Sequence, residues 1–82
     1  MNNELTPYII YHDTGNVWIK GQKNSSGQRE GIWEWFYEDG DICRAPYKEG
    51  KKDGIEEWFD GQGNITETYL WENGKLIETT EN

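Results

Sequence analysis

The sequence predicts an all-β fold, a single antiparallel meander sheet of stacked β-hairpin repeats. The first observation is an internal repeat: residues 31–36 read Gly-Ile-Trp-Glu-Trp-Phe and residues 54–59 read Gly-Ile-Glu-Glu-Trp-Phe. The flanking glycines at 27, 31 and 40 recur at 50, 54 and 63, a period of 23 residues. A short fixed period indicates one structural unit stacked on copies of itself. The second observation is composition, because aromatic side chains form 15% of the chain and favour pleated sheets.

The 82 residues predict one domain, 1–82, whose first repeat-like unit, at about residues 8–31, is a diverged copy. Pro7 introduces a β-branched and aromatic run at 8–11, residues 12–16 read as a turn, and residues 17–20 read as the return strand. Gly15 matches Gly40 and Gly63 of the later units. The spacing to the second unit is 25 residues, so we expect an insertion in the loop 24–27. Residues 1–6 are expected to be frayed.

The second and third units, at about 32–54 and 55–76, are fuller copies. In the second, Asp39-Gly40 lies between two apolar runs, which is a strong hairpin signal. Pro46 has no N–H to give to a ladder, so the return strand is expected to be irregular or at an edge there. After the third hairpin, the turn Asn73-Gly74 introduces a last short strand at 75–78. The tail 79–82 is expected to be loose, and no helix is predicted.

Strand alternation sorts the side chains of the two fuller copies onto two faces. The first face takes Trp33, Trp35 and Tyr37 with Glu56, Trp58 and Asp60. The second face takes Ile32, Glu34 and Phe36 with Ile55, Glu57 and Phe59. A single-layered sheet with apolar groups on both faces must curl over one of them or leave one for a partner. The copies differ on the first face, which is therefore the predicted partner surface.

The chain carries a net charge of −8, and residues 30–60 contribute ten acidic and four basic side chains. Such a field repels nucleic acid and anionic membranes and attracts basic proteins, although plain solubility explains the charge equally well. Glu34 and Glu57 occupy equivalent strand positions and repel each other unless cations intervene. The candidates to neutralise them are Arg29, Arg44, Lys51 and Lys52; the alternative is a display of carboxylates for a basic partner.

The repeat resembles the MORN repeat, and in particular the bacterial variant of YwqK-type antitoxin proteins. The resemblance is carried by residues 47–54, which read Tyr-Lys-Glu-Gly-Lys-Lys-Asp-Gly, by the Ile55, Trp58 and Phe59 that follow, and by the further start at 71–76. It implies β-hairpins laid side by side and functions in protein binding, scaffolding, membrane attachment or toxin neutralisation. The chain lacks the basic face of the membrane-binding members, so no membrane partner is expected.

Little in the sequence indicates catalysis, a cofactor or a metal site. Cys43 is the one cysteine and His12 the one histidine, and nothing flanks either to suggest a nucleophile elbow or an oxyanion hole. Zinc spacing is missing, and residues 38–41 lack the alternating ligands of a calcium loop. We therefore expect a protein that is not an enzyme and uses no cofactor. The chain has one cysteine, and no apolar run is long enough for a signal peptide or a membrane span. These features favour a cytoplasmic protein of a bacterium, or of a bacterial host if the protein is phage-encoded.

The first functional hypothesis is a non-enzymatic, protein-binding inhibitor that covers a basic, nucleic-acid-binding surface with its acidic aromatic sheet, without binding nucleic acid itself. An antitoxin or immunity protein and a phage-encoded inhibitor of a host defence nuclease, such as an anti-CRISPR, both fit. The alternative is a structural or oligomerisation scaffold of MORN-repeat type, a homodimer that pairs through an aromatic face or an open edge. The predicted partner-binding residues are Trp33, Trp35, Tyr37, Glu34, Glu38, Asp39, Asp41, Glu56, Glu57, Trp58 and Asp60.

Overall fold

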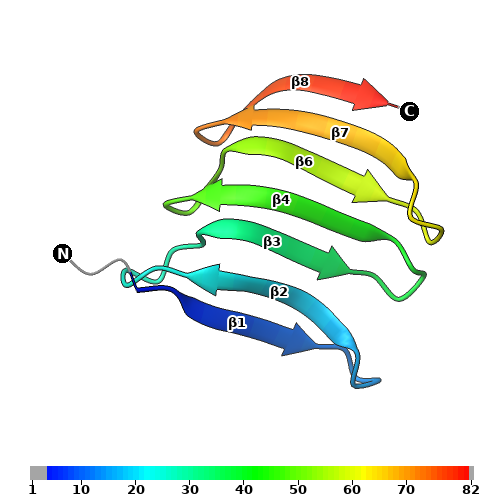
Figure 1. The fold of residues 1–82 in the computed structure, drawn as a ribbon, viewed down its shortest axis with the longest axis horizontal. Helices are drawn as coiled ribbons and strands as arrows, with labels where there is room; N and C mark the ends of the chain where they lie inside the picture. Colours follow the sequence, from blue (N-terminus) through cyan, green and yellow to red (C-terminus); the bar gives the residue numbers. More distant parts are fainter. Residues whose placement is uncertain (1–3, 82) are drawn as a thin grey trace.

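The computed structural model describes residues 4–81 as one antiparallel sheet, with no helix in that range, which confirms the predicted fold class. Its strands are β1 (Thr6–Tyr11), β2 (Val17–Lys23), β3 (Gly31–Phe36), β4 (Ile42–Lys48), β5 (Lys51–Lys52), β6 (Gly54–Phe59), β7 (Ile65–Glu72) and β8 (Lys75–Glu81). The order across the sheet follows the chain, β1-β2-β3-β4-β6-β7-β8, and the short β5 pairs with β4 (Figure 1). The molecule measures 41 × 35 × 14 Å, so the described residues form a single layer.

Three hairpin turns with the same geometry close the β1–β2, β3–β4 and β6–β7 hairpins. In each turn, at residues 12–16, 37–41 and 60–64, the first N–H donates to the fifth carbonyl at 2.8–2.9 Å. The fourth residue is Gly15, Gly40 or Gly63, with φ of 96°, 100° and 87°, a conformation that side chains disfavour. The glycine spacing read from the sequence therefore marks equivalent turns, as predicted.

The sheet is irregular at Pro46, as the sequence predicts. β4 pairs with β6 at residues 42–44, and beyond Pro46 it pairs with the short β5 instead. The Pro46 carbonyl accepts the Asp53 N–H at 3.0 Å. A Cβ at Gly54 would lie 2.8 Å from Pro46 Cγ, so the chain between β5 and β6 passes close around the proline ring. The irregularity lies inside the sheet and not at its edge.

The buried residues all lie on one face, near the middle of the sheet. Trp33 and Ala45 have no exposed surface, and Cys43 and Glu56 are each 4% exposed. Because the molecule is one layer thick, this core is covered by side chains that lie flat on the sheet and not by a second layer of secondary structure. The sheet thus covers one face with its own side chains, an arrangement that was not among the two outcomes expected from the sequence.

The two ends of the chain differ in part from expectation. The predicted last strand is present, but it is longer than 75–78: β8 pairs with β7 as far as Glu81. Thr79 pairs with Tyr69 and Thr80 with Thr68, so backbone pairing with β7 extends over exposed residues of the predicted tail. At the other end β1 already begins at Thr6. Residues 1–3 and 82, also expected to be frayed, lie outside the described residues.

Candidate functional site

Meander topology gathers five carboxylates at one end of the sheet. The turns at 12–16, 37–41 and 60–64 all connect a rightward to a leftward strand and therefore lie together along one edge (Figure 1). They hold no Lys or Arg, and their acidic residues are Asp13, Glu38, Asp39, Asp41 and Asp60. Neighbouring turns are two strands apart, about 10 Å. We call these five carboxylates the acidic edge.

Hydrogen bonds inside the turns fix two of these carboxylates. Asp60 Oδ1 accepts the N–H groups of Gln62 and Asn64 at 2.9 and 3.0 Å, and Asp39 Oδ1 accepts the Asp41 N–H at 2.9 Å. The bonds from the Asn64 and Gln62 backbone lower the pKa of Asp60 below its usual value, because they favour the ionised form. Asp60 therefore keeps its charge at neutral pH.

The three turns are joined to one another. A Cβ built on Gly40 would lie 3.3 Å from the Gly61 Cα, so the second and third turns are in close contact. His12 Nε2 donates to the Phe36 carbonyl at 2.6 Å, and its Nδ1 lies 4.0 Å from a Glu38 carboxylate oxygen. A hollow of 340 Å³ lies between the first two turns. The acidic edge is thus one continuous surface.

Half-buried aromatic rings line the inner side of the acidic edge. The Tyr37 and Trp58 rings stack at 5.7 Å with an interplanar angle of 23°, and Trp18 meets Tyr37 edge-on at 4.9 Å. His12 lies 4.9 Å from Trp18 on its other side. Burial, followed by the nearby Cys43 and Glu56, raises the pKa of Tyr37, so its hydroxyl stays neutral. Trp18, Tyr37 and Trp58 form what we call the aromatic row.

Trp33, a predicted partner-binding residue, is inaccessible from outside. Its indole lies flat over Gly21 of β2, where a Cβ would come within 2.2 Å of the ring. Its Nε1–H donates to the Gln22 carbonyl at 3.0 Å, and the Arg29 guanidinium lies 4.7 Å from the ring. Trp35 remains half-buried, with its ring 6.4 Å from that of Trp33. With no exposed surface, Trp33 stabilises the sheet and offers nothing for contact.

Glu56 is also placed inside the molecule, where it is surrounded by donors. Its Oε1 accepts from Lys52 Nζ and Trp71 Nε1, both at 2.8 Å, and its Oε2 accepts from Trp58 Nε1 at 2.6 Å. The Cys43 thiol lies 3.6 Å from Oε2. Burial alone would raise the pKa of Glu56, but the bonds from Lys52 and the two indoles outweigh it and lower the pKa. Glu56 is a buried, ionised centre that ties β4, β5, β6 and β7 together.

Glu34 and Glu57 lie on the other face and flank Arg44. Arg44 pairs in register with Glu34 on β3 and with Glu57 on β6. Its Nη2 lies 3.0 Å from Glu34 Oε2, and its guanidinium lies 5.3 Å from the Phe59 ring centre. Of the four cations proposed to neutralise these carboxylates, Arg44 takes that position. Lys52 instead binds Glu56, and Arg29 lies over the aromatic rings.

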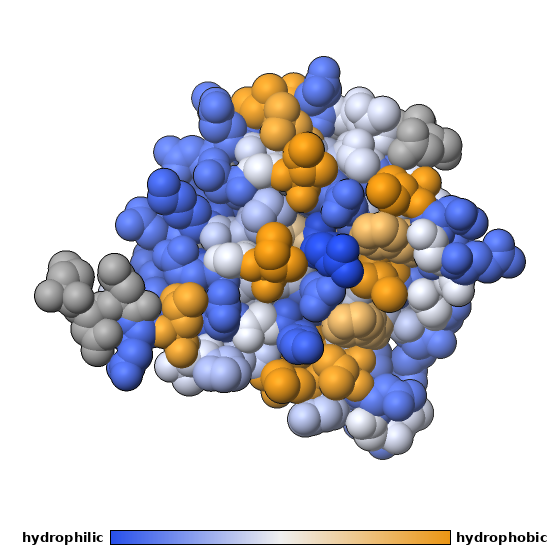
Figure 2. Space-filling view, viewed as in Figure 1, coloured by the Kyte–Doolittle hydropathy of each residue, from blue (hydrophilic) through white to orange (hydrophobic). Residues whose placement is uncertain are grey.

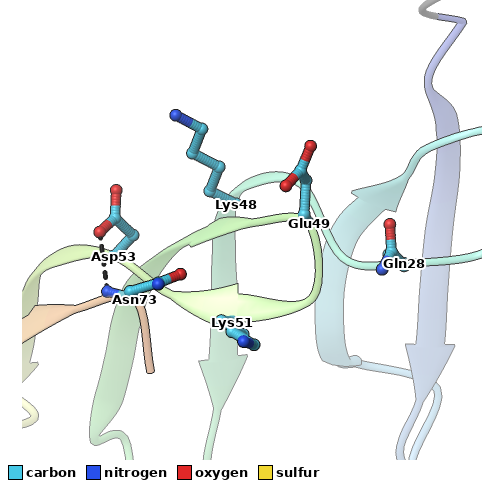
Figure 3. Close-up of a pocket in the computed structure, with 6 residues that line it drawn as sticks. All are labelled: Gln28, Lys48, Glu49, Lys51, Asp53 and Asn73. Carbon is cyan, nitrogen blue, oxygen red and sulfur yellow. Dashed lines mark hydrogen bonds between the residues drawn. The ribbon is translucent and has the colours of Figure 1, made fainter. Parts of the chain in front are cut away.

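The opposite end of the sheet has a different charge pattern. Its turns, within residues 23–30, 48–53 and 72–75, hold six basic and four acidic side chains. A hollow of 530 Å³ lies there, lined by Gln28, Lys48, Glu49, Lys51, Asp53 and Asn73 (Figure 3). The two lysines and two carboxylates balance one another, and Asp53 is already bonded to the Asn73 N–H. The charge of the chain is therefore directional, with one uniformly acidic edge and one mixed edge.

The structure therefore divides the predicted partner-binding residues among three places. Glu38, Asp39, Asp41 and Asp60 lie on the acidic edge, with Tyr37 and Trp58 beside them. Trp33, Trp35 and Glu56 belong to the packed aromatic face, and Glu34 and Glu57 lie on the opposite face. The sequence did not predict Asp13, which belongs to the acidic edge, or Trp18, which belongs to the aromatic row. A signal for Asp13 was available, because it is the second residue of a turn equivalent to the turn at 37–41.

Comparison with known families agrees with the hairpin repeat. A family model described as a MORN repeat variant matches residues 29–49, which span β3, its turn and β4. The matched segment is thus one structural hairpin, including the most acidic of the three turns. No curated protein and no solved structure matches the chain. The described part of the chain has no helix of the length and apolarity needed to cross a membrane.

Proposed function

We propose that this chain is a non-enzymatic, protein-binding inhibitor that covers the nucleic-acid-binding surface of a basic target protein. The observation that carries the proposal is the acidic edge: five carboxylates on three joined turns, with no Lys or Arg in any of them. A row of negative charges with no cation among them raises the local concentration of a positively charged partner and steers its approach. The groove of a nucleic-acid-handling protein is such a partner, because it is lined with Lys and Arg.

The aromatic row supplies the part of the interface that charge alone does not. Rim charges mainly speed association, whereas aromatic anchors near the centre of an interface slow dissociation. Tyr37 and Trp58 are half-buried, stacked on each other and placed directly behind the acidic turns. The basic side chains of such a groove would therefore contact the carboxylates of the acidic edge and, next to them, the flat rings of the aromatic row. Arg side chains stack well on such rings.

Within this class we favour a bacterial antitoxin or immunity protein, or a phage-encoded inhibitor of a host defence nuclease such as an anti-CRISPR. The resemblance to the YwqK-type repeat variant supports the first and the small, strongly acidic chain suits both. Either acts in the bacterial cytoplasm, needs no cofactor, and contacts a protein and not nucleic acid or membrane.

Two variants of equal charge test the proposal. The Asp13→Lys, Glu38→Lys variant reverses two exposed carboxylates on the acidic edge, and the Glu72→Lys, Glu78→Lys control reverses two exposed ones elsewhere. Both have a net charge of −4, because each exchanges two carboxylates for two ammonium groups. We expect basic proteins captured from the native host by the wild type and the control to be lost from the edge variant. Capture should also weaken as salt rises, since exposed charges are screened. Equal capture by all three proteins, or capture of neutral partners insensitive to salt, contradicts the proposal.

The MORN repeat match also fits the alternative of a structural or oligomerisation scaffold. The sequence predicts that two copies pair through an aromatic face or an open edge. The packing disfavours the aromatic face, because Trp33 has no exposed surface and Trp35, Tyr47 and Arg29 already lie against it. A scaffold role would therefore use an open edge or another surface of the sheet.

A further inference from the structure

The face opposite the aromatic rings carries a row of charges that alternate in sign. Lys20 pairs in register with Glu34, Glu34 with Arg44, and Arg44 with Glu57. These residues lie on β2, β3, β4 and β6, which are consecutive strands of the sheet. The row therefore reads positive, negative, positive, negative across four neighbouring strands. It is neutral as a whole, in a chain whose net charge is −8.

Two apolar bands run parallel to this row, one on each side of it. Figure 2 shows them as hydrophobic side chains separated by hydrophilic ones across the middle of the sheet. The first band consists of Ile32, Pro46, Ile55 and Leu70, and the second of Phe36, Ile42, Phe59 and Ile65. Ile32 is 51% exposed and Ile55 is 56% exposed. Apolar surface of this extent, rimmed by charge, marks an interaction site.

The alternation makes this face complementary to itself. Two copies can pack with these faces together around a two-fold axis that lies between the two sheets, parallel to the strands, at the position between β3 and β4. This axis places Lys20 opposite Glu57 of the second copy, and Glu34 opposite Arg44 of the second copy. The same axis sets each apolar band against its own counterpart, because it preserves position along the strands. Every charge in the row then meets its opposite, as an isologous interface requires.

We propose that two copies of this chain pack face to face through this surface to form a homodimer. Each face of the 41 × 35 Å sheet covers on the order of 1,000 Å², and stable interfaces bury about 800 Å² per partner. A second copy suits it better than a basic protein, which would meet Lys20 and Arg44. Sheets packed in this way lie about 10 Å apart. The proposal goes beyond the inhibitor function and does not depend on it.

A charge-swap series tests the arrangement. Within one chain Lys20 and Glu57 are three strand spacings apart, about 14 Å, so they do not contact each other directly. Across the proposed interface they face each other twice. We expect Lys20→Glu and Glu57→Lys each to weaken dimerisation about tenfold or more, and the double variant to restore it. Sedimentation equilibrium measures the three dissociation constants against that of the wild type.

Net charge predicts a different pattern, which makes the series decisive. If overall repulsion alone governed association, Glu57→Lys would strengthen the dimer, because it lowers the net negative charge. Ile55→Lys on the proposed interface should yield a monomer, whereas Leu76→Lys, similarly exposed but paired with Trp71 of the aromatic face, should not. Circular dichroism confirms that each variant is folded. A monomeric wild type, or a double variant no tighter than the singles, overturns the proposal.

Discussion

Replacing Gly21 with Ala should destabilise this protein by an amount out of proportion to one methyl group. Gly21 is an interior residue of β2, and the Trp33 indole lies directly on its backbone. A Cβ there would be 2.2 Å from Trp33 Cδ2, 2.4 Å from Cε2 and 2.6 Å from Cγ. No real contact is that short, and the three atoms belong to one rigid ring. The ring must therefore move.

The cost follows from what Trp33 loses. Forcing extra volume into a packed core costs about 1–3 kcal/mol. Displacing the ring also weakens the Nε1–H bond to the Gln22 carbonyl, worth about 1 kcal/mol. We therefore expect the free energy of unfolding to fall by about 2–4 kcal/mol. A chain of this length is expected to have a total stability of only about 4–12 kcal/mol, so the effect is large.

Urea denaturation followed by tryptophan fluorescence measures the change, and Gly61→Ala is the matched control. At Gly61 the added Cβ would meet nothing closer than 3.6 Å, so that variant should be neutral or slightly stabilised. In a Trp33→Leu background, Gly21→Ala should cost much less, because the obstructing ring is gone. Equal stability of Gly21→Ala and Gly61→Ala, or the same loss for Gly21→Ala with and without the indole, would show that no steric clash with Trp33 exists.

The buried Glu56 and the neighbouring Cys43 give three further predictions. Glu56→Gln removes the charge that binds Lys52, Trp58 and Trp71. In a denaturation experiment the free energy of unfolding should fall by about 1–3 kcal/mol, and the partial exposure of Lys52 limits this loss. Unchanged stability would contradict the hydrogen-bond network around Glu56. The folded-state pKa of Glu56 lies below its ordinary 4.5, so its ionised form favours folding above that pH, and the stability is lost as the pH falls through the lowered pKa. The wild-type advantage over Glu56→Gln should therefore shrink below about pH 4.5, and an advantage that grows on acidification would reverse the sign. Finally, burial, followed by Glu56, raises the pKa of the Cys43 thiol to about 12. Iodoacetamide at pH 8 should label native Cys43 about a thousandfold more slowly than the urea-unfolded chain, and comparable rates would rule out the buried thiol.

The fold could be read from the sequence because the repeat fixes both the turns and the strand alternation. Gly15, Gly40 and Gly63 mark turns that close with the same hydrogen bonds, and their recurrence at spacings of 25 and 23 residues is visible without a structure. Pro46 marks the break in the β4 ladder for the simple reason that it lacks an N–H. β8 extended past its predicted end because backbone pairing with β7 can hold polar residues that have no packing signal of their own.

The site was predicted less well, because alternation assigns a residue to a face but says nothing about what covers that face. Trp33 is buried because Gly21, opposite it on the next strand, leaves room for the ring. Glu56 is the equivalent of Trp33 in the third unit, and the residue beside it on the preceding strand β4 is Ala45, whose Cβ leaves no such room. A glycine inside a strand often marks a close approach, so Gly21 was the available signal. The grouping of the acidic turns at one edge depends on meander topology and could be recognised only with the strand order known.

Competition with nucleic acid tests whether the acidic edge covers the nucleic-acid-binding surface of a basic partner. A basic partner captured by the wild-type chain is mixed with a fluorescent DNA or RNA duplex, and fluorescence anisotropy is followed as the chain is added. We expect the wild type to displace the duplex and the Asp13→Lys, Glu38→Lys variant to do so at least about tenfold less well. The Glu72→Lys, Glu78→Lys control should match the wild type. A ternary complex in which duplex and chain bind together would contradict this expectation.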